Sequence, residues 1–338
     1  MSLSESGNDG SAPQRFLVTG ALGCIGAWTV RDLAREGTFV VTFDQASDPR
    51  RVRQICSDEE LGRITFAQGD ITDLASVERA LDDHGITHIV HLAALQVPFC
   101  RADPPLGARV NVLGTVNIFE AARRRMDRIR QVVYTGSVGM FDAADADPTT
   151  RRLENDATAH PVNHYGGYKQ ANEGTARVYW LENGLSSISL RPMTVYGPGR
   201  DQGLTSSPTK AIVAAVLGRP ATIGFSGRTL FQLADDVART LLIASRSPLR
   251  GAHAFNLGGS LVDLHEFVTL VDDMVPGAGD LIRVEGAPLP FPDEISDDAL
   301  AALGPVPVTP IRDGIAATVA FATRLRDSGQ LVPAQQGL

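Results

Sequence analysis

Short apolar runs alternate with longer amphipathic segments along the first part of the chain. The apolar runs are bounded by Gly, Asp or Ser and predict strands at residues 16–19, 38–43, 64–68, 87–92, 131–136 and 186–191. Between these runs apolar residues recur at helical spacing, which predicts helices at 24–36, 73–83, 107–125 and 164–183. Strands that alternate with helices imply right-handed crossovers. The pattern therefore predicts an α/β fold of the Rossmann type, a doubly wound parallel sheet with helices on both faces.

The pattern changes after about residue 196, where Pro and Gly become more frequent. Shorter stretches of helical spacing follow at 207–218, 234–245 and 263–274. We interpret residues 14–195 as the sheet domain and residues 196–338 as a smaller, mixed substrate-binding region. Residues 235–259 are expected to return to the sheet. Residues 1–13 are rich in Ser, Gly and Asp, so we expect a disordered N-terminus.

A glycine-rich loop links the first predicted strand to the first predicted helix. It runs from Thr19 to Gly26 in the pattern T-G-x-x-G-x-x-G. Gly20 allows a tight turn, Gly23 allows backbone to approach a pyrophosphate, and Gly26 allows the helix to pack on the strand. The start of the helix then offers free N–H groups and a positive dipole to phosphates. The sheet domain is therefore predicted to bind a dinucleotide.

The second predicted strand ends at Asp44, about twenty residues after this loop. A carboxylate at that place accepts hydrogen bonds from the adenosine ribose diol and repels a 2′-phosphate. Asp44 therefore favours NAD as the cofactor. Arg50, Arg51 and Arg53 follow closely and leave NADP as the less favoured alternative.

Tyr165 and Lys169 are four residues apart on a predicted helix, so they lie on one face about 6 Å apart along its axis. An ammonium group beside a phenol favours the phenolate and lowers its pKa, as a general acid–base requires. Ser137 ends the strand predicted at 131–136 and can hydrogen-bond the same substrate oxygen. Tyr168 is the alternative acid–base, although it points elsewhere on the helix.

These motifs and others resemble the extended short-chain dehydrogenase/reductases, the NAD-dependent epimerase/dehydratase superfamily. The resemblance covers roughly residues 15 to 320, and its motifs occur in family order. Besides the loop, Ser137 and the Tyr165/Lys169 pair, the matching segments are 69–71, 91–94, 111–115, 191–192, 196–199, 235–238 and 255–259. The resemblance implies an NAD-dependent oxidoreductase acting on carbohydrates, and a homodimer formed through the helices at 107–125 and 164–183.

The resemblance also assigns roles to individual residues. The implied catalytic residues are Ser137, Tyr165 and Lys169. The implied NAD-binding residues are Gly20, Gly23, Cys24, Ile25, Gly26, Asp44, Asp70, Ile71, Leu92, Ala93, Ala94, Asn111, Tyr165 and Lys169. Asp70 and Ile71 are expected to flank the adenine, and Asn111 is expected to brace the cofactor loops. We interpret His91 as a core histidine, and Asp235 and Asp236 as caps of the following helix.

Two departures concern the residues that bind nucleotide sugars in this superfamily. The R-D-F/Y-[IV]-H segment of those enzymes is replaced by 228–234, in which only Arg228 remains, shifted by one position. The later R-x-G-D segment corresponds to 289–293, which contains no arginine. The Asp-Glu pair of the 4,6-dehydratases is replaced by Val138 and Gly139, which argues against dehydration.

Three hypotheses for function follow. The first is net NAD-dependent oxidation or reduction at a secondary alcohol of a sugar, sugar acid or similar small substrate, because the diphosphate-binding arginines are missing. The alternative is a nucleotide-sugar (UDP-sugar) 4-epimerase with rearranged anchors, which requires that Arg200, Arg228 or Arg283 line the pocket. The second alternative is a non-catalytic sensor of NAD(H), which an intact set of catalytic residues argues against.

Composition narrows the possible partners. The 338 residues carry a net charge of −8, which argues against nucleic acid and acidic membrane surfaces. The basic run 123–130 is interpreted as a solvated helix end. Three scattered cysteines lack metal-binding spacing, so we expect no metal, no disulfide framework and a reducing compartment. No membrane-length apolar run and no signal peptide is seen, so the expected location is the cytoplasm.

Overall fold

The fold is described by a computed structural model over residues 13–150 and 152–331. Its centre is a seven-stranded parallel sheet, which confirms the predicted fold class. In spatial order its strands are β11 (Ala252–Asn256), β7 (Ser186–Arg191), β5 (Gln131–Thr135), β4 (His88–His91), β1 (Arg15–Thr19), β2 (Phe39–Asp44) and β3 (Ile64–Gln68). Residues of the segment 235–259 supply helix α10 (Ala234–Ser245) and the edge strand β11. The predicted disordered segment, residues 1–13, lies outside the described residues except for its last residue.

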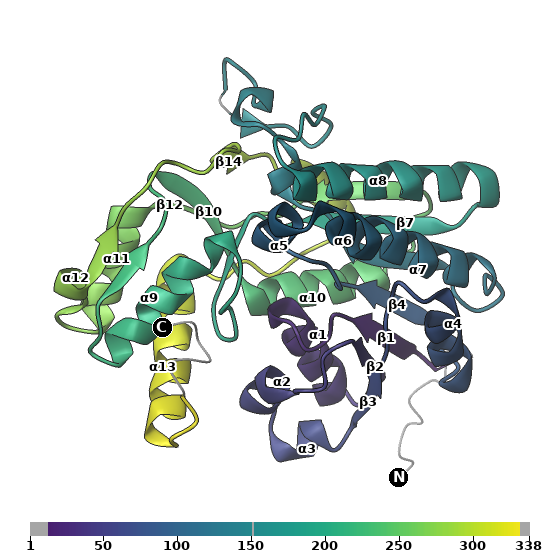
Figure 1. Ribbon diagram of the computed structural model, residues 1–338, viewed down its shortest axis with the longest axis horizontal. Helices are drawn as coiled ribbons and strands as arrows, with labels where there is room; N and C mark the ends of the chain where they lie inside the picture. Colours follow the sequence, from purple (N-terminus) through teal and green to yellow (C-terminus); the bar gives the residue numbers. More distant parts are fainter. Residues whose placement is uncertain (1–12, 151, 332–338) are drawn as a thin grey trace, which may run out of the picture.

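Alternate residues of the central strands pack into two separate hydrophobic cores, because successive side chains point to opposite faces of a sheet. Phe16 and Val18 pack with α1 (Cys24–Arg35) and α10, whereas Leu17 packs with the opposite layer of helices. That opposite layer consists of α4 (Leu74–Asp83), α7 (Gly114–Arg123) and α8 (His164–Asn183). Figure 1 shows the strands between these two helical layers. Two shorter helices, α2 (Arg50–Ile55) and α3 (Asp58–Leu61), lie between β2 and β3 in the chain.

The helix predicted at 107–125 is interrupted. Helices α5 (Val97–Ala102) and α6 (Pro104–Ala108) come first, and a π-helical turn at Arg109–Leu113 then leads into α7. The turn contains Asn111, whose side chain bonds the backbone of Leu95 through both its oxygen (2.7 Å) and its nitrogen (2.9 Å). Single π-helical turns often occur at functional sites. This one fixes the chain that follows β4.

The C-terminal part builds a second, smaller unit that lies to the left in Figure 1. Strands β8 (Thr194–Tyr196), β10 (Arg228–Leu233) and β12 (Ser260–Asp263) form its sheet, with β10 parallel to β8 and antiparallel to β12. Two strand pairs complete it: β9 (Ala221–Ile223) with β13 (Ile282–Val284), and β6 (Arg152–Leu153) with β14 (Glu294–Ile295). Its helices are α9 (Ser207–Val216), α11 (Leu264–Met274), α12 (Ala278–Leu281) and α13 (Ile311–Asp327).

This unit has a core of its own. The rings of Phe231 and Phe267 stack with centroids 4.8 Å apart, and Tyr196 meets Phe231 edge-on at 5.6 Å. Aromatic pairs at these separations stabilise a core beyond the area they bury. Helix α13 and the short strand pairs escaped prediction from the sequence. The strand pairs are only two or three residues long and need partners that are distant in the chain, so their own sequence pattern is weak.

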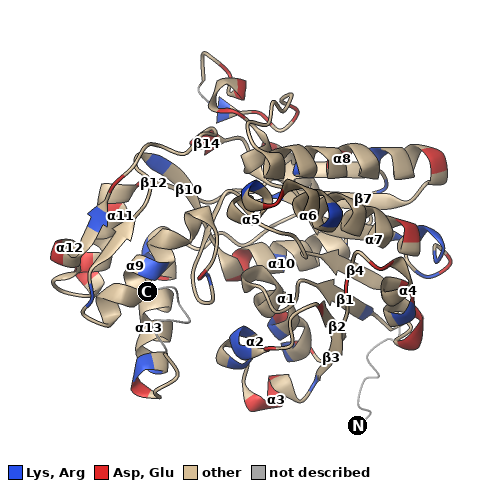
Figure 2. Ribbon diagram, viewed as in Figure 1, with Lys and Arg blue, Asp and Glu red and all other residues tan. Residues whose placement is uncertain are grey.

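Basic and acidic residues are interspersed along the ribbon in Figure 2. In the basic run 123–130, Arg125 and Arg128 both pair with Asp82, and Arg124 pairs with Glu78 and Glu120. The interpretation of this run as a solvated helix end agrees with these pairs. Among the helices of the described residues, none combines the length and the apolarity that crossing a membrane requires.

Candidate functional site

The glycine-rich loop passes close to the end of β4. Gly20 has φ +65°, and a Cβ on it would lie 2.6 Å from the backbone nitrogen of Ala93. A Cβ on Gly26 would overlap the carbonyl oxygen of Gly20 and lie 2.7 Å from Cα of Ala21. Both positions therefore require glycine, for conformation in one case and for close packing in the other. Gly23 precedes α1 without a side-chain cap, so the N–H groups of the first turn, at Cys24 and Ile25, remain available to a ligand.

Two carboxylates flank this loop at the ends of β2 and β3. Asp44 accepts a hydrogen bond from the Leu22 N–H (3.0 Å) and another from the Ala46 N–H (3.0 Å), so it fixes the loop. Asp70 accepts from the Thr72 N–H (2.8 Å), and the neighbouring Ile71 is buried. The structure thus brings both acids to the carboxyl edge of the sheet, where ligands bind in doubly wound folds.

The end of β4 is held by Thr19. Its hydroxyl accepts from the N–H groups of Leu92 and Ala93, each at 3.2 Å. The same hydroxyl bonds Nδ1 of His91 (2.7 Å), whose Nε2 bonds Thr115 (3.1 Å). Burial lowers the pKa of His91 to about 3, so it is a neutral, fully bonded core histidine as interpreted. Ala94 comes next and lines a cavity.

These features fit a nicotinamide dinucleotide. The crowded glycines leave room for backbone to meet a pyrophosphate, and the uncapped start of α1 offers it N–H groups. Asp44 ends β2, and Asp70 and Ile71 closely follow the neighbouring parallel strand β3, so a carboxylate is available on both strands for an adenosine. Ala93 and Ala94 come soon after β4, and Ala94 lines the cavity.

The cavity lies beyond the carboxyl ends of β4 and β5 and has a volume of about 170 Å³. Ser137, Tyr165 and Lys169 line it together, with Ile25, Leu92 and Ala94 from the cofactor side. The second unit contributes apolar and polar residues: Met193, Val195, Arg200, Leu204, Thr205 and Phe291. Sequence reasoning missed Gln96, Thr205 and Phe291, which line the cavity from segments without a recognisable motif.

Helix α8 positions Tyr165 and Lys169. Asn163 caps the helix by accepting from the Gly166 N–H (3.0 Å). A Cβ on Gly166 would lie 2.5 Å from the carbonyl oxygen of Gly139, so this glycine lets the helix approach the turn that carries Ser137. Lys169 Nζ donates to the Thr135 carbonyl (2.7 Å) and lies 5.7 Å from the centroid of the Tyr165 ring.

Burial dominates the titration of both groups. It raises the pKa of Tyr165, while a hydrogen bond with Ser137 and the charge of Arg200 act in the opposite direction. Burial lowers the pKa of Lys169 to about 8. For Tyr165 the effect of burial is therefore larger than the combined lowering by Ser137 and Arg200.

Tyr168 does not line this cavity. Its hydroxyl donates to the carbonyl of Pro104 (2.8 Å), and its ring stacks on His164 with centroids 6.2 Å apart. Asn172, one turn beyond Lys169, donates to the Asn111 carbonyl (2.9 Å) and so joins α8 to the π-helical turn. The geometry separates Tyr165 from Tyr168 as the side chain that can meet a substrate.

Only one of the three arginines proposed as anchors lines the cavity. Arg228 is half exposed and pairs with Asp293 at 3.0 Å, and Arg283 is exposed on β13. Thr229, beside Arg228, is buried and bonds Thr194 (2.7 Å). Arg200 lines the cavity with Tyr165.

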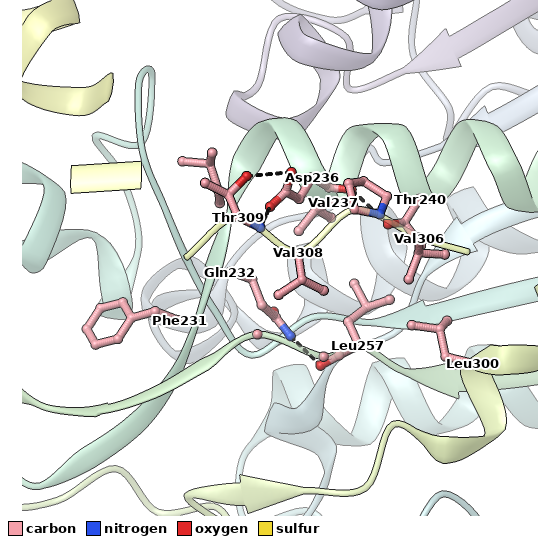
Figure 3. Close-up of a pocket in the computed structure, with 14 residues that line it drawn as sticks. Phe231, Gln232, Asp236, Val237, Thr240, Leu257, Leu300, Val306, Val308 and Thr309 are labelled. Carbon is pink, nitrogen blue, oxygen red and sulfur yellow. Dashed lines mark hydrogen bonds between the residues drawn. The ribbon is translucent and has the colours of Figure 1, made fainter. Parts of the chain in front are cut away.

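Asp235 and Asp236 do not cap α10, so that interpretation is wrong. Helix α10 begins without a side-chain cap. Asp236 instead accepts from the N–H (2.6 Å) and the hydroxyl (3.0 Å) of Thr309, as Figure 3 shows. Asp235 pairs with Arg31 and Arg239. The cavity in Figure 3 measures about 20 Å³, which suits one water molecule and excludes a substrate.

The loop between β8 and α9 crosses over the glycine-rich loop. The carbonyl of Pro198 accepts from the indole N–H of Trp28 (3.0 Å). Asp201 pairs with Arg51 (2.5 Å) and Arg50 (3.6 Å), and Arg51 also donates to the Leu22 carbonyl (3.0 Å). Two of the three arginines that left NADP open, Arg50 and Arg51, are thus engaged by a carboxylate of the second unit.

The chain is similar to known proteins over most of its length. The NAD dependent epimerase/dehydratase family matches residues 16–258. A UDP-glucose 4-epimerase of Mycolicibacterium smegmatis is 32% identical over 326 residues, which is 91% of this chain and 98% of that protein. The solved UDP-glucose 4-epimerase of Thermus thermophilus with NAD is 28% identical with a TM-score of 0.76, covering 91% of this chain and 99% of that one. MoeE5 in complex with UDP-glucuronic acid and NAD is 27% identical with a TM-score of 0.76, covering 92% and 99%.

Proposed function

The chain belongs to the NAD-dependent epimerase/dehydratase family and is an enzyme of the extended short-chain dehydrogenase/reductase type, and from this premise we propose that it is an NAD-dependent 4-epimerase of UDP-sugars. The observation that carries the proposal is the cavity lined by Ser137, Tyr165 and Lys169 beside the glycine-rich loop. The near full-length similarity to a UDP-glucose 4-epimerase supports the epimerase hypothesis over net oxidation of a small substrate. The sensor hypothesis is not carried forward, because the chain is an enzyme.

In this proposal Tyr165 is the acid–base and Ser137 holds the substrate oxygen. When bound, NAD supplies the acceptor and donor of hydride. Tyr165 takes the proton of the sugar hydroxyl as hydride leaves the same carbon, and a ketone remains. Bound NAD would return the hydride to the opposite face of the ketone, and Tyr165 would return the proton to the new hydroxyl. One carbon is inverted and no net oxidation results.

Lys169 and Asn111 act through other groups. Lys169, anchored on the Thr135 carbonyl, places a positive charge beside Tyr165 and holds the nicotinamide ribose. Asn111 braces the chain after β4, where Leu92, Ala93 and Ala94 pass the cofactor. Gly20, Gly23, Cys24, Ile25 and Gly26 hold the pyrophosphate, while Asp44, Asp70 and Ile71 hold the adenosine.

The test is incubation of purified enzyme with UDP-glucose or UDP-galactose, with product chromatography and absorbance at 340 nm. We expect conversion to the C4 epimer without net NADH. Conversion of neither these nor other UDP-sugars would overturn the proposal.

A second candidate is net dehydrogenation of a sugar or sugar acid that carries no nucleotide. The outward ion pair of Arg228 and the absence of an arginine from residues 289–293 favour it, because a diphosphate then lacks a cation at each of the two segments. Each charged hydrogen bond of that kind contributes about 1.5–3 kcal/mol. Stoichiometric NADH formation from a free sugar or sugar acid would establish this candidate.

The cofactor preference is a separate prediction. We expect NAD to bind at least about tenfold more tightly than NADP, because Asp44 accepts from a ribose diol and repels a 2′-phosphate. In Asp44→Ala the difference between the two dissociation constants should shrink, as measured by titration calorimetry. Asp48→Ala, in the same exposed loop, is the control. Equal weakening of both cofactors by Asp44→Ala would contradict the proposed role.

We also propose a homodimer formed through α7 and α8. These helices flank an open groove, and Val178 and Leu181 of α8 are 47% and 64% exposed. Figure 2 shows few charges along α8. Light scattering should give twice the mass of one chain for the wild type and the mass of one chain for Leu181→Glu, because the carboxylate would be buried. Phe66→Glu, at an equally apolar exposed position on β3, should leave the mass unchanged.

The three cysteines of the chain, Cys24, Cys56 and Cys100, are all free thiols. We therefore propose a reducing compartment, the cytoplasm.

A further inference from the structure

Asn155 lies two residues after β6 and connects it to the edge of the central sheet. Its side-chain nitrogen donates to the carbonyl of Ala254 (2.9 Å), and its side-chain oxygen accepts from the N–H of Asn256 (2.9 Å). Ala254 and Asn256 both belong to β11. Asn256 in turn donates through its side chain to the carbonyl of Ser296, the residue after β14 (3.1 Å). One side chain thus fastens the short β6–β14 pair to the end of β11.

Arg191, at the end of β7, bonds the backbone of the same residue. Its Nη1 donates to the Asn155 carbonyl (2.7 Å), and its Nη2 pairs with Glu173 of α8 at 2.7 Å. Arg191 is 6% exposed, so these bonds are shielded from water. Glu173 lies about one turn after Lys169 on α8. The segment after β6 is therefore connected to the helix that carries Tyr165 and Lys169.

The β6–β14 pair also contacts the wall of the cavity. Leu153 of β6 and Ile295 of β14 are buried in a small hydrophobic core, and Phe291 packs against this core. Met193 belongs to the same core. Phe291 and Met193 both line the cavity with Tyr165. The position of the β6–β14 pair therefore determines where this part of the wall lies.

We propose that Asn155 is a positioning residue, which fixes the β6–β14 pair to the sheet and so holds Phe291 against the sugar in the cavity. Asn155 does not line the cavity, so it acts through Phe291. An amide suits this role because it donates and accepts at once, whereas a carboxylate of the same size only accepts. This inference rests on the proposed function, because it takes the cavity as the place of the reacting sugar.

Hydrogen exchange of the NAD-bound enzyme tests the positioning without any substrate. In Asn155→Ala the amides of Phe291 and Ile295 should exchange at least about tenfold faster than in the wild type, because the β6–β14 pair is no longer fastened to β11. Exchange in α8 should stay the same, because Asn163 still caps that helix. Asp156→Ala, at the exposed neighbouring position, is the control and should change neither region.

Kinetics test whether Asn155 acts through Phe291. Asn155→Ala should raise KM for the UDP-sugar about five- to fiftyfold and lower kcat less than about threefold, because the side chains that meet the reacting carbon are retained. Phe291→Ala should raise KM to a similar extent. The double variant should raise KM no further, because two substitutions that remove one contact are not additive. Asn155→Asp should recover part of the loss, because its carboxylate still accepts from the N–H of Asn256.

Two kinetic results would overturn the positioning role. One is a KM in the double variant that equals the product of the two separate increases. The other is a lower kcat at unchanged KM in Asn155→Ala, which a smaller fraction of folded enzyme alone would cause. If Asn155→Ala does not fold, the same comparisons are made with Asn155→Asp.

A wild type that turns over no sugar would reject the proposed function, and hydrogen exchange then decides the positioning role alone. In that case faster exchange at Phe291 in Asn155→Ala supports the role, and an unchanged exchange rate rejects it.

Discussion

Tyr165→Phe is expected to lower kcat about 10²- to 10⁴-fold, the range that general acid–base catalysis supplies. The substitution removes one oxygen from a partly buried ring beside Ser137 and leaves α8 capped by Asn163. Substrate and NAD binding should change little, because phenylalanine keeps the shape of the ring. The measurement is the initial rate of epimer formation, with NAD affinity determined separately by titration.

Tyr168→Phe is the matched control for this prediction. Tyr168 lies on the same helix, three residues later, but its hydroxyl bonds Pro104 and not the cavity. Its loss should leave kcat within about threefold of the wild type and cost about 1 kcal/mol of stability. A large loss of kcat in Tyr168→Phe with activity retained in Tyr165→Phe would reverse the assignment.

Lys169→Met is expected to lower kcat/KM by at least about 10²-fold, because the charge beside Tyr165 and the contact with the cofactor ribose both disappear. In the wild type, kcat/KM should fall as the pH rises through about 8, since burial lowers the pKa of Lys169 to about 8 and the ammonium is lost above it. The descending limb should be absent in Lys169→Met. Rates from pH 6 to 10 test this, and Lys210→Met, on α9, is the control.

The stability of the same variant follows from linkage. The pKa of Lys169 is lower in the folded chain than in the unfolded chain, so the unfolded chain binds more protons between pH 8 and 10.5. The contribution of Lys169 to the free energy of unfolding therefore rises with pH across that window. Below it, the buried charge lowers the free energy of unfolding by about 3 kcal/mol. Removing the charge offsets the lost bond to Thr135. Lys169→Met should unfold in urea at pH 7 no earlier than the wild type, whereas a clear loss of stability would contradict a costly buried charge.

Much of the site could be predicted because its residues are local. Tyr165 and Lys169 lie four residues apart on one helix, and Gly20, Gly23 and Gly26 lie close together where a strand leads into the first turn of a helix. Asp44, Asp70 and Ser137 each follow a strand, and parallel strands end at the same edge of the sheet. Backbone geometry and the rules of parallel sheets thus place these residues together without knowledge of distant contacts.

The residues that shape the cavity could not be placed in this way. Gln96, Thr205 and Phe291 come from three separate segments and carry no motif. Arg200 and Arg228 are equally arginines in the sequence, yet one lines the cavity and the other pairs with Asp293 at the surface. The two arginines differ in the carboxylates near them. Arg228 pairs with Asp293, whereas Asp201, the neighbour of Arg200 in the chain, pairs with Arg50 and Arg51.

Local patterns were enough to predict the parallel sheet, the dinucleotide loop and the order of the candidate catalytic residues, because each depends on periodicity or on spacing within a few turns of chain. Three other features became clear only from the folded structure. Asp236 accepts a hydrogen bond from Thr309 instead of capping α10, and Arg200 is the arginine that lines the cavity. Burial also has a larger effect on the pKa of Tyr165 than nearby charges have. Each of these depends on desolvation or on a partner far away in the chain, which local sequence patterns do not encode.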